Sequence, residues 1–142
     1  MVEFALIVSI FVLLLVGLFD VGRAVFAFHT VNNAAREAAR LAIVDQTVTH
    51  IEDEAVVAAS GLGLESADIS VSFEDEAGNP CTTLGSDDVY LCHAVVEVTY
   101  PYSASTPLIG NLIGQIDLIG ESSFPVATNC REPDKPQCPL GS

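Results

Sequence analysis

The chain has 142 residues, a net charge of −14 and a composition that is 50% hydrophobic. This length suits one modest domain with an appendage, and it argues against an enzyme with separate cofactor and substrate lobes. All of the excess negative charge lies in residues 41–130, which contain fourteen acidic residues and neither Lys nor Arg. Because such a surface repels phosphate backbones, nucleic acid is excluded as a partner.

The N-terminal region predicts one helix of about forty residues. Residues 4–19 are apolar except for Ser9, and as a helix this run is about 24 Å long, somewhat short for a bilayer core of about 30 Å. From Val21 to Ala42, apolar residues continue at three- and four-residue spacing and predict an amphipathic helix. We expect the first part to lie in lipid or in a helical bundle, and the second to pack on a head domain.

The amphipathic part has an expected polar face, on which Asp20 is placed to pair with Arg23, and Glu37 with Arg40. That face comprises Asp20, Arg23, Thr30, Asn33, Arg36, Glu37 and Arg40. No basic segment precedes the apolar run, and no small-residue cleavage site follows it before Asp20. We therefore expect the run to be retained in the working protein rather than removed as a secretory signal.

Glu3 lies one residue before the apolar run. A carboxylate drawn to bilayer depth costs about 3 kcal/mol unless it is paired or solvated. Glu3 therefore either lies at headgroup level without a special role or has a cationic partner. Both alternatives stay open from the residues alone.

A second helix is predicted from near His50. Thr49 and Glu52 have the spacing of a capping box, in which the two side chains satisfy free backbone amides at a helix start. Gly61 and Gly63 are expected to end this helix.

The remainder of the head predicts strands of an antiparallel sheet. Alternating apolar and polar residues occupy 68–73, 89–100 and 116–127, and Pro125 places the last stretch at a sheet edge or at a bulge. The expected fold is therefore α+β, with a three- to four-stranded sheet beside a short helix. We expect three parts: a transmembrane or filament-core helix at 1–45, an acidic head at 46–127 and a Pro-rich tail at 128–142.

All four cysteines fall after the helix, at Cys81, Cys92, Cys130 and Cys138. An even number beyond a membrane-type helix indicates two disulfides in an oxidising compartment, with three pairings allowed. We favour Cys81 with Cys92 and Cys130 with Cys138, because each closes a short loop and would contribute about 3 kcal/mol. A metal site built from these cysteines and His93 is the alternative, but no C-x-x-C pair is present.

Two acidic clusters, residues 74–76 and 87–88, are candidate calcium ligands. They lack the spacing of a calcium-binding loop, so we interpret them as solvated acidic loops. His29 and His50 have no neighbours that indicate a catalytic triad, and no phosphate-binding glycine loop is present. We expect no enzyme activity, no cofactor and no metal.

The segment from Val2 to Ala42 closely resembles the N-terminal helix of TadE-like proteins, which are pseudopilins of tight-adherence (Tad) pilus systems. The matching positions are Glu3, Phe4, Asp20, Gly22, Arg23, His29, Asn33, Ala34, Ala35, Arg36, Glu37, Ala39 and Arg40. Tyr100–Pro101 and residues 106–110 are similar to later family segments, more loosely. The cysteines and the tail from Thr128 are not typical of the family.

The resemblance implies a bacterial cell-envelope protein that is inserted with its N-terminus inside, processed by a prepilin peptidase and assembled into or alongside a pilus. The family is cut after a glycine several residues before its Glu-Phe pair, whereas only Met1 and Val2 precede Glu3 here. Either the sequence starts late or processing differs. In pilins the equivalent glutamate neutralises the N-terminal amine of a neighbouring subunit, which would provide a partner for Glu3.

We expect a structural subunit that waits in the inner membrane and then polymerises with itself, aided by pilus assembly machinery, into an adhesive filament at the cell surface. The expected assembly residues are Glu3, Phe4, Asp20, Arg23, Arg36, Glu37 and Arg40. Arg23, Arg36 and Arg40 are the only bases before Arg131, and we expect them to meet acidic heads of neighbouring subunits. The alternatives are a minor pseudopilin that primes or caps assembly, and a membrane-anchored module that binds calcium or a carbohydrate.

Overall fold

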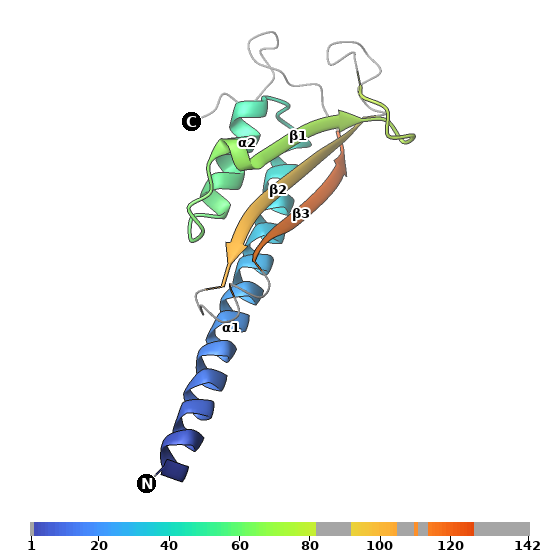
Figure 1. Cartoon of the computed structure of the whole chain (residues 1–142). Helices are drawn as coiled ribbons and strands as arrows, with labels where there is room; N and C mark the ends of the chain where they lie inside the picture. Colours follow the sequence, from blue (N-terminus) through green and yellow to red (C-terminus); the bar gives the residue numbers. More distant parts are fainter. Residues whose placement is uncertain (1, 82–91, 105–109, 111–113, 127–142) are drawn as a thin grey trace.

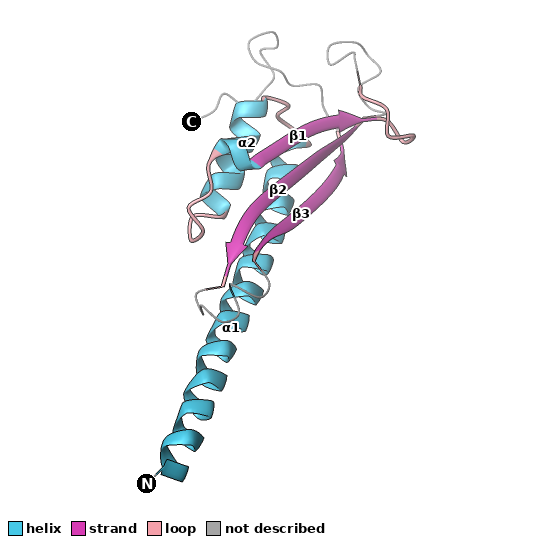
Figure 2. Cartoon of the chain, in the orientation of Figure 1, coloured by secondary structure: helices cyan, strands magenta, loops and turns pink. Residues whose placement is uncertain are grey.

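The computed structural model describes residues 2–81, 92–104, 110 and 114–126. In this part of the chain, one long helix carries a short second helix and a three-stranded antiparallel sheet (Figures 1 and 2). The expected α+β fold with a long N-terminal helix is confirmed. The N-terminus lies at the free end of the long helix, away from the head (Figure 1).

Helix α1 runs without a break over Val2–Ala42. Its 41 residues correspond to a rod of about 62 Å at 1.5 Å per residue. The first half protrudes from the head, whereas the second half lies behind the sheet (Figure 1). The expected change of environment along one continuous helix is therefore present.

The second half of α1 contributes its small side chains to the hydrophobic core. Six of them are fully buried: Val31, Ala34, Ala35, Ala38, Ala39 and Ala42. They pack against β2, β3 and the second helix, where Ile51, Val96 and Val98 are the largest fully buried partners. Alanine lets the helix approach its neighbours closely, so this stretch of α1 is an integral part of the head's core.

Helix α2 spans Val48–Ala58, and its start differs from the predicted one. The N-cap is Thr47, whose side chain makes no capping hydrogen bond, while Thr49 of the expected capping box is exposed on the first turn. Asp45 takes over this role, because its Oδ1 accepts the backbone N–H of Thr47 at 2.8 Å. An aspartate that bonds the amide two residues later forms a turn by itself, so the helix begins earlier than the capping box predicts. It also ends at Ala58, before Gly61 and Gly63.

The sheet has the order β1-β2-β3, with β1 at Ile69–Glu74, β2 at His93–Ser103 and β3 at Gln115–Pro125. Both pairings are antiparallel. β3 lies at an edge, as Pro125 predicts. The start of the second predicted strand, at Val89, lies outside the described residues.

β2 continues beyond the predicted end at Tyr100, through Pro101 to Ser103. Proline lacks a backbone N–H and is tolerated only where no neighbouring strand needs it. The pairing of β1 with β2 stops at Val98, whereas β3 pairs as far as Ser103. Pro101 therefore has a paired strand on one side only, and the strand passes through it.

Gly120 of β3 allows the closest approach between the sheet and α1. A Cβ atom placed on Gly120 would lie 2.8 Å from Val31 Cγ1 and 2.9 Å from the backbone N of Asn32. Only a residue without a side chain fits there, because such contacts force neighbouring atoms to move. The helix and the edge strand therefore meet backbone to backbone at this point.

Candidate functional site

The first half of α1 presents a bare apolar surface. Every large hydrophobic side chain from Phe4 to Phe19 is exposed, with Phe4 72% and Phe19 73% exposed, and we call this segment the stalk (residues 4–19). Its single polar side chain, Ser9, donates its hydroxyl to the carbonyl of Ala5 at 2.8 Å. A helix whose polar groups are all satisfied internally is suited to lipid or to a bundle of helices.

Exposed apolar residues continue along α1 past the stalk. Val21, Val25, Phe26 and Phe28 are exposed. The stalk alone is about 24 Å long, and these residues extend the exposed apolar surface beyond it toward the length of a bilayer core, about 30 Å. By length and composition, α1 qualifies as a membrane-spanning helix.

Asp20 lies at the junction between the stalk and the head and is buried, which corrects its predicted place on the polar face. It shares one side of α1 with Ala27, Val31 and Ala38, at spacings of seven, eleven and eighteen residues, each close to a whole number of helical turns. The spacing itself would have placed Asp20 on the core side. Its acidic character led to the opposite assignment.

Tyr102 connects the end of β2 to this junction. Its hydroxyl donates to the backbone carbonyl of Asp20 at 2.7 Å, across 82 positions of sequence. Burial raises the pKa of Tyr102, and the negative charge of Asp20 raises it further. A pocket of about 150 Å³ lies beside these two residues, with Ala24 and Ile116 also in its lining. The hydrogen bond from Tyr102 to the carbonyl of Asp20 fixes where the head sits on α1.

The two ion pairs predicted along α1 are present. Arg23 Nη1 lies 3.8 Å from Asp20 Oδ1, and Arg40 Nη1 lies 3.5 Å from Glu37 Oε2. Arg40 and Glu37 are both well exposed, so the pair between them contributes little stability. Arg36 is exposed as well and forms no ion pair within the described residues. The basic groups of α1 thus remain accessible to another molecule.

Glu3 and Phe4 occupy the first turn of α1, at the end farthest from the head. A carboxylate there is favoured by the unpaired backbone amides of the helix start. Both side chains are exposed, and no cationic side chain of the described residues pairs with Glu3. The structure thus separates Glu3 and Phe4 from the other expected assembly residues, which line the junction and the upper half of α1.

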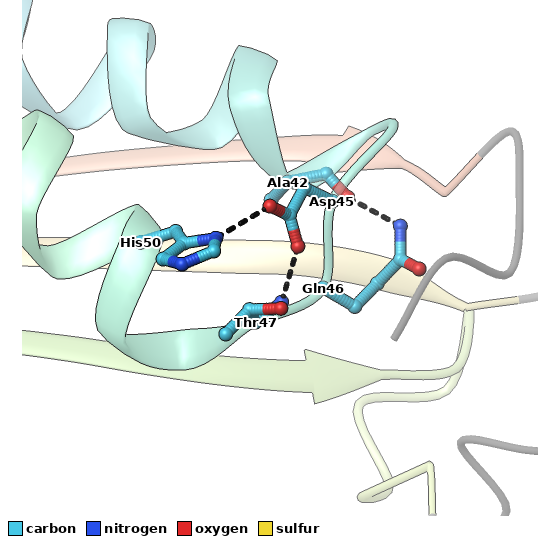
Figure 3. A network of polar contacts seen from close by, with 5 residues as sticks. All are labelled: Ala42, Asp45, Gln46, Thr47 and His50. Carbon is cyan, nitrogen blue, oxygen red and sulfur yellow. Dashed lines mark hydrogen bonds and ion pairs between the residues drawn. The ribbon is translucent and has the colours of Figure 1, made fainter. Parts of the chain in front are cut away.

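A polar network joins the end of α1 to the start of α2 (Figure 3). Asp45 accepts from the amide of Thr47 and bonds His50 Nδ1 at 2.8 Å, while Gln46 donates to the carbonyl of Ala42 at 3.0 Å. Burial tends to raise the pKa of Asp45, but the hydrogen bonds from His50 and Thr47 outweigh burial and hold the pKa below its ordinary value. These bonds hold the turn between the two helices, and the sequence patterns did not predict them.

The structure joins Cys81 and Cys92 by a disulfide, which is the pairing favoured from the sequence. Bonded sulfurs are not thiolate ligands, so this bond removes two donors from the alternative metal site with His93. The second expected pair, Cys130 and Cys138, lies outside the described residues. The disulfide ties the turn after β1 to the start of β2 and so fixes the far end of the sheet.

The acidic turn after β1 holds its own hydrogen bonds. The backbone and side-chain amides of Asn79 donate to the carboxylate of Asp75, as does the backbone amide of Ala77, and these bonds lower the pKa of Asp75. Within the described residues, no three His, Cys, Asp or Glu side chains are grouped to hold a metal ion. The second acidic cluster, at 87–88, lies outside the described residues.

Comparison with known protein families matches residues 1–40 to the family of TadE-like proteins. The N-terminal helix of this chain is therefore similar to that of TadE-like proteins. The match covers the stalk, the junction at Asp20 and the buried alanines of α1 from Ala34 to Ala39, and it ends before α2 and the sheet. A search of curated proteins and a search of solved structures each gave no match.

The TadE-like match implies a protein associated with a Tad pilus, with the pilus assembly machinery among its partners. The apolar helix fits a membrane-anchored protein of that system.

Proposed function

We propose that this chain is a structural subunit of an adhesive pilus-like filament at the bacterial surface, and that it polymerises through its stalk. The observation that carries this proposal is the bare apolar surface from Phe4 to Phe19 on a helix whose other half is fully built into a head. The TadE-like match over the same helix supports it. In the membrane this surface contacts lipid, and in the filament it contacts the stalks of neighbouring subunits.

The shape of the helix supports packing against other helices. A hollow of about 320 Å³ lies on its surface at the upper end of the stalk and the turn that follows. It is lined by Leu15, Leu18, Phe19, Gly22, Arg23 and Phe26. In helix bundles, a large apolar side chain of one helix fills a hole of this kind on the next. Lipid tails are as apolar as Leu, so this close packing, rather than the hydrophobic effect, would drive the exchange of lipid for protein.

Glu3 is assigned to pairing within the filament core. Once stalks pack side by side, its carboxylate leaves the water and requires a cation, because an unpaired charge in an apolar core is strongly destabilising. The N-terminal amine of a neighbouring copy supplies that cation. Phe4 packs beside the pair and excludes water from it.

Asp20, Arg23 and Glu37 are assigned to the presentation of the head. Asp20 pairs with Arg23 and receives Tyr102 on its backbone carbonyl, so the head stands at one fixed position on α1. Glu37 orients Arg40 one turn away. A fixed head lets successive subunits repeat the same contacts along a filament.

The test of this proposal is Glu3→Gln in the full chain, produced in cells that assemble the filament. We expect the variant to reach the membrane as well as the wild type and to be lost from sheared filaments, because the amine of the neighbour is left unpaired. Asp53→Asn is the matched control: it removes one exposed carboxylate from α2 and should leave assembly unchanged. Normal filament yield from Glu3→Gln would contradict the proposal.

A minor pseudopilin that primes or caps the filament is the second candidate. The match to the TadE-like family favours it, because the resemblance is to pseudopilins. The two roles differ in stoichiometry: a structural subunit forms most of the mass of the sheared fibres, whereas a priming subunit is present at one or a few copies per fibre. Quantitative mass spectrometry of that fraction separates them.

A further inference from the structure

The sheet has an outer face that no described element covers (Figure 1). The side chains of this face alternate with the buried ones, and four of them are acidic: Glu74, Glu97, Asp117 and Glu121. Ile119 stands among them and is 52% exposed. We call this surface the acidic sheet face (Glu74, Glu97, Asp117, Ile119 and Glu121).

Two of these acids lie directly opposite each other. Glu97 of β2 is the register partner of Glu121 of β3, and paired residues on one face have Cβ atoms about 5 Å apart. Like charges in this position destabilise a sheet. Within the described residues, no Lys or Arg lies in the sheet to offset them. The acidic sheet face is therefore better stabilised with a cationic partner than without one.

The opposite side of the head carries the positive charge. Arg36 and Arg40 are exposed on the side of α1 that faces away from the core residues Ala34, Ala35 and Ala38. They are one helical turn apart, which separates their Cβ atoms by about 6 Å. This spacing is close to that of the Glu97–Glu121 pair. We call the surface formed by these two side chains the arginine face (Arg36 and Arg40).

We propose that the acidic sheet face of one copy docks on the arginine face of a second copy, with Arg36 and Arg40 pairing with Glu97 and Glu121. This inference rests on the proposed function and names the contact between heads. The two faces lie on opposite sides of one head, so each copy offers one to a copy ahead and the other to a copy behind. A head-to-tail contact of this type repeats without closing and generates a helical filament.

The acids of α2 offer a weaker fit to the same partner. Asp53 lies on a helix that packs beside α1 itself, so it is on the same side of the sheet as the arginine face. Asp53 also has no acidic cross-strand partner, so a cation bound there would not relieve a like-charge repulsion of the kind that Glu97 and Glu121 experience. The arginine face of another copy is therefore the partner that we propose for the acidic sheet face.

The decisive experiment is a charge exchange in the full chain. We expect Arg36→Glu with Arg40→Glu to lower the yield of sheared filaments about tenfold or more, because like charges then face each other at every contact. Glu97→Arg with Glu121→Arg should do the same. A chain with all four substitutions has both faces inverted, and its filament yield should return toward that of the wild type.

Two measurements decide how these results are interpreted. Membrane-fraction abundance shows that each variant is made and anchored. Asp53→Arg with Glu76→Arg raises the net charge by the same amount at exposed sites off the acidic sheet face and should assemble normally. The inference would be overturned if this control lost as much filament yield as the charge-reversal variants. It would also be overturned if the chain with all four substitutions did not regain filament yield.

A chemical cross-link gives a readout that does not depend on filament yield. Arg36→Lys keeps the charge and supplies an amine, which a carbodiimide joins to a carboxylate in contact with it. We expect wild-type-like filaments in which Lys at position 36 of one copy is linked to Glu97 or Glu121 of another. Links from position 36 only to other acids would overturn the inference and leave the proposed function standing. Absence of wild-type filaments containing this chain would overturn the proposed function itself.

Discussion

The two halves of α1 belong to one continuous helix and have opposite environments. The lower half has bulky side chains, such as Phe11, Leu14 and Leu18, which are at least 60% exposed. The upper half has alanines, such as Ala35 and Ala38, which are fully buried. Side-chain size thus correlates with what each half contacts: small residues admit the sheet of the same chain, and large residues are left for lipid or other subunits.

This difference shows how one unbroken helix can both form part of the core of the head and present an exposed apolar surface. The upper half packs its alanines into the core of the head, and Gly120 of the edge strand meets Val31 and Asn32 of α1 at backbone distance. The large side chains of the stalk cannot pack that closely on a sheet, but they suit helix-to-helix contacts. Breaking either half should therefore cause a different failure.

Leu13→Asp should cause the largest effect, and it acts on the stalk alone. A carboxylate near the middle of the bare segment costs about 3 kcal/mol in a bilayer, or roughly a hundredfold in partitioning. Carbonate extraction of membranes measures this loss. Asn33→Asp introduces the same group at an exposed site on the upper half and should leave anchoring intact; equal extraction of both variants would contradict the division of the helix.

Gly120→Ala tests the upper half and should lower the free energy of unfolding of the head by about 2 kcal/mol, because the new Cβ overpacks the contact with Val31. Chemical denaturation of the full chain in detergent, followed by circular dichroism, measures it. Gly22→Ala is the matched control, since nothing lies within 4 Å of a Cβ there, and alanine in a helix is expected to be neutral or stabilising. Similar destabilisation of both variants would show that close approach is not the cause.

Tyr102→Phe tests the junction between the halves. It should lower the free energy of unfolding by about 1 kcal/mol, the usual contribution of one hydrogen bond. The hydroxyl that donates to the carbonyl of Asp20 is lost, while the ring keeps its packing. Tyr100→Phe is the control, because the hydroxyl of Tyr100 makes no hydrogen bond within the described residues. Amide hydrogen exchange should rise around Asp20 in Tyr102→Phe only, and an unchanged pattern would remove Tyr102 from the account.

The smallest effect concerns the polar network at Asp45. Its pKa lies below the ordinary value of 3.8, so the carboxylate favours the folded state above pH 3.8, and this contribution disappears as the pH falls through the lowered value. Asp45→Asn should therefore lower the stability of the head near neutral pH. As the pH falls below 3.8, the variant should lose less stability than the wild type does. Parallel stability curves in acid for the two chains would contradict this role.

Hydrophobic periodicity predicted the helix and the strands, because burial on one face repeats locally along a chain, and Pro125 predicted the edge position of β3. The same logic, applied by spacing alone, would have placed Asp20 on the core side of α1. Two features of the structure could not be predicted from the periodicity of the sequence. The bond from Tyr102 to Asp20 joins residues 82 positions apart, and the opposition of Glu97 to Glu121 depends on strand register, which only the folded sheet defines.

The start of α2 shows a different kind of error. The sequence contains two capping signals within a few residues, Asp45 and the Thr49–Glu52 box, and local propensity does not rank them. Asp45 prevails because it also binds His50 and lies where α1 ends. A glycine inside a strand pattern, as at Gly120, was the available sign of a close backbone approach.

The central claim is that the stalk forms the core of a filament, and cryo-electron microscopy of the sheared surface fraction tests it most directly. The account predicts continuous fibres whose density traces this chain, with the stalks packed at the axis, Glu3 beside the N-terminus of a neighbour, and the heads outside with the acidic sheet face against the arginine face. Fibres built of another subunit, with this chain left in the membrane, would contradict it.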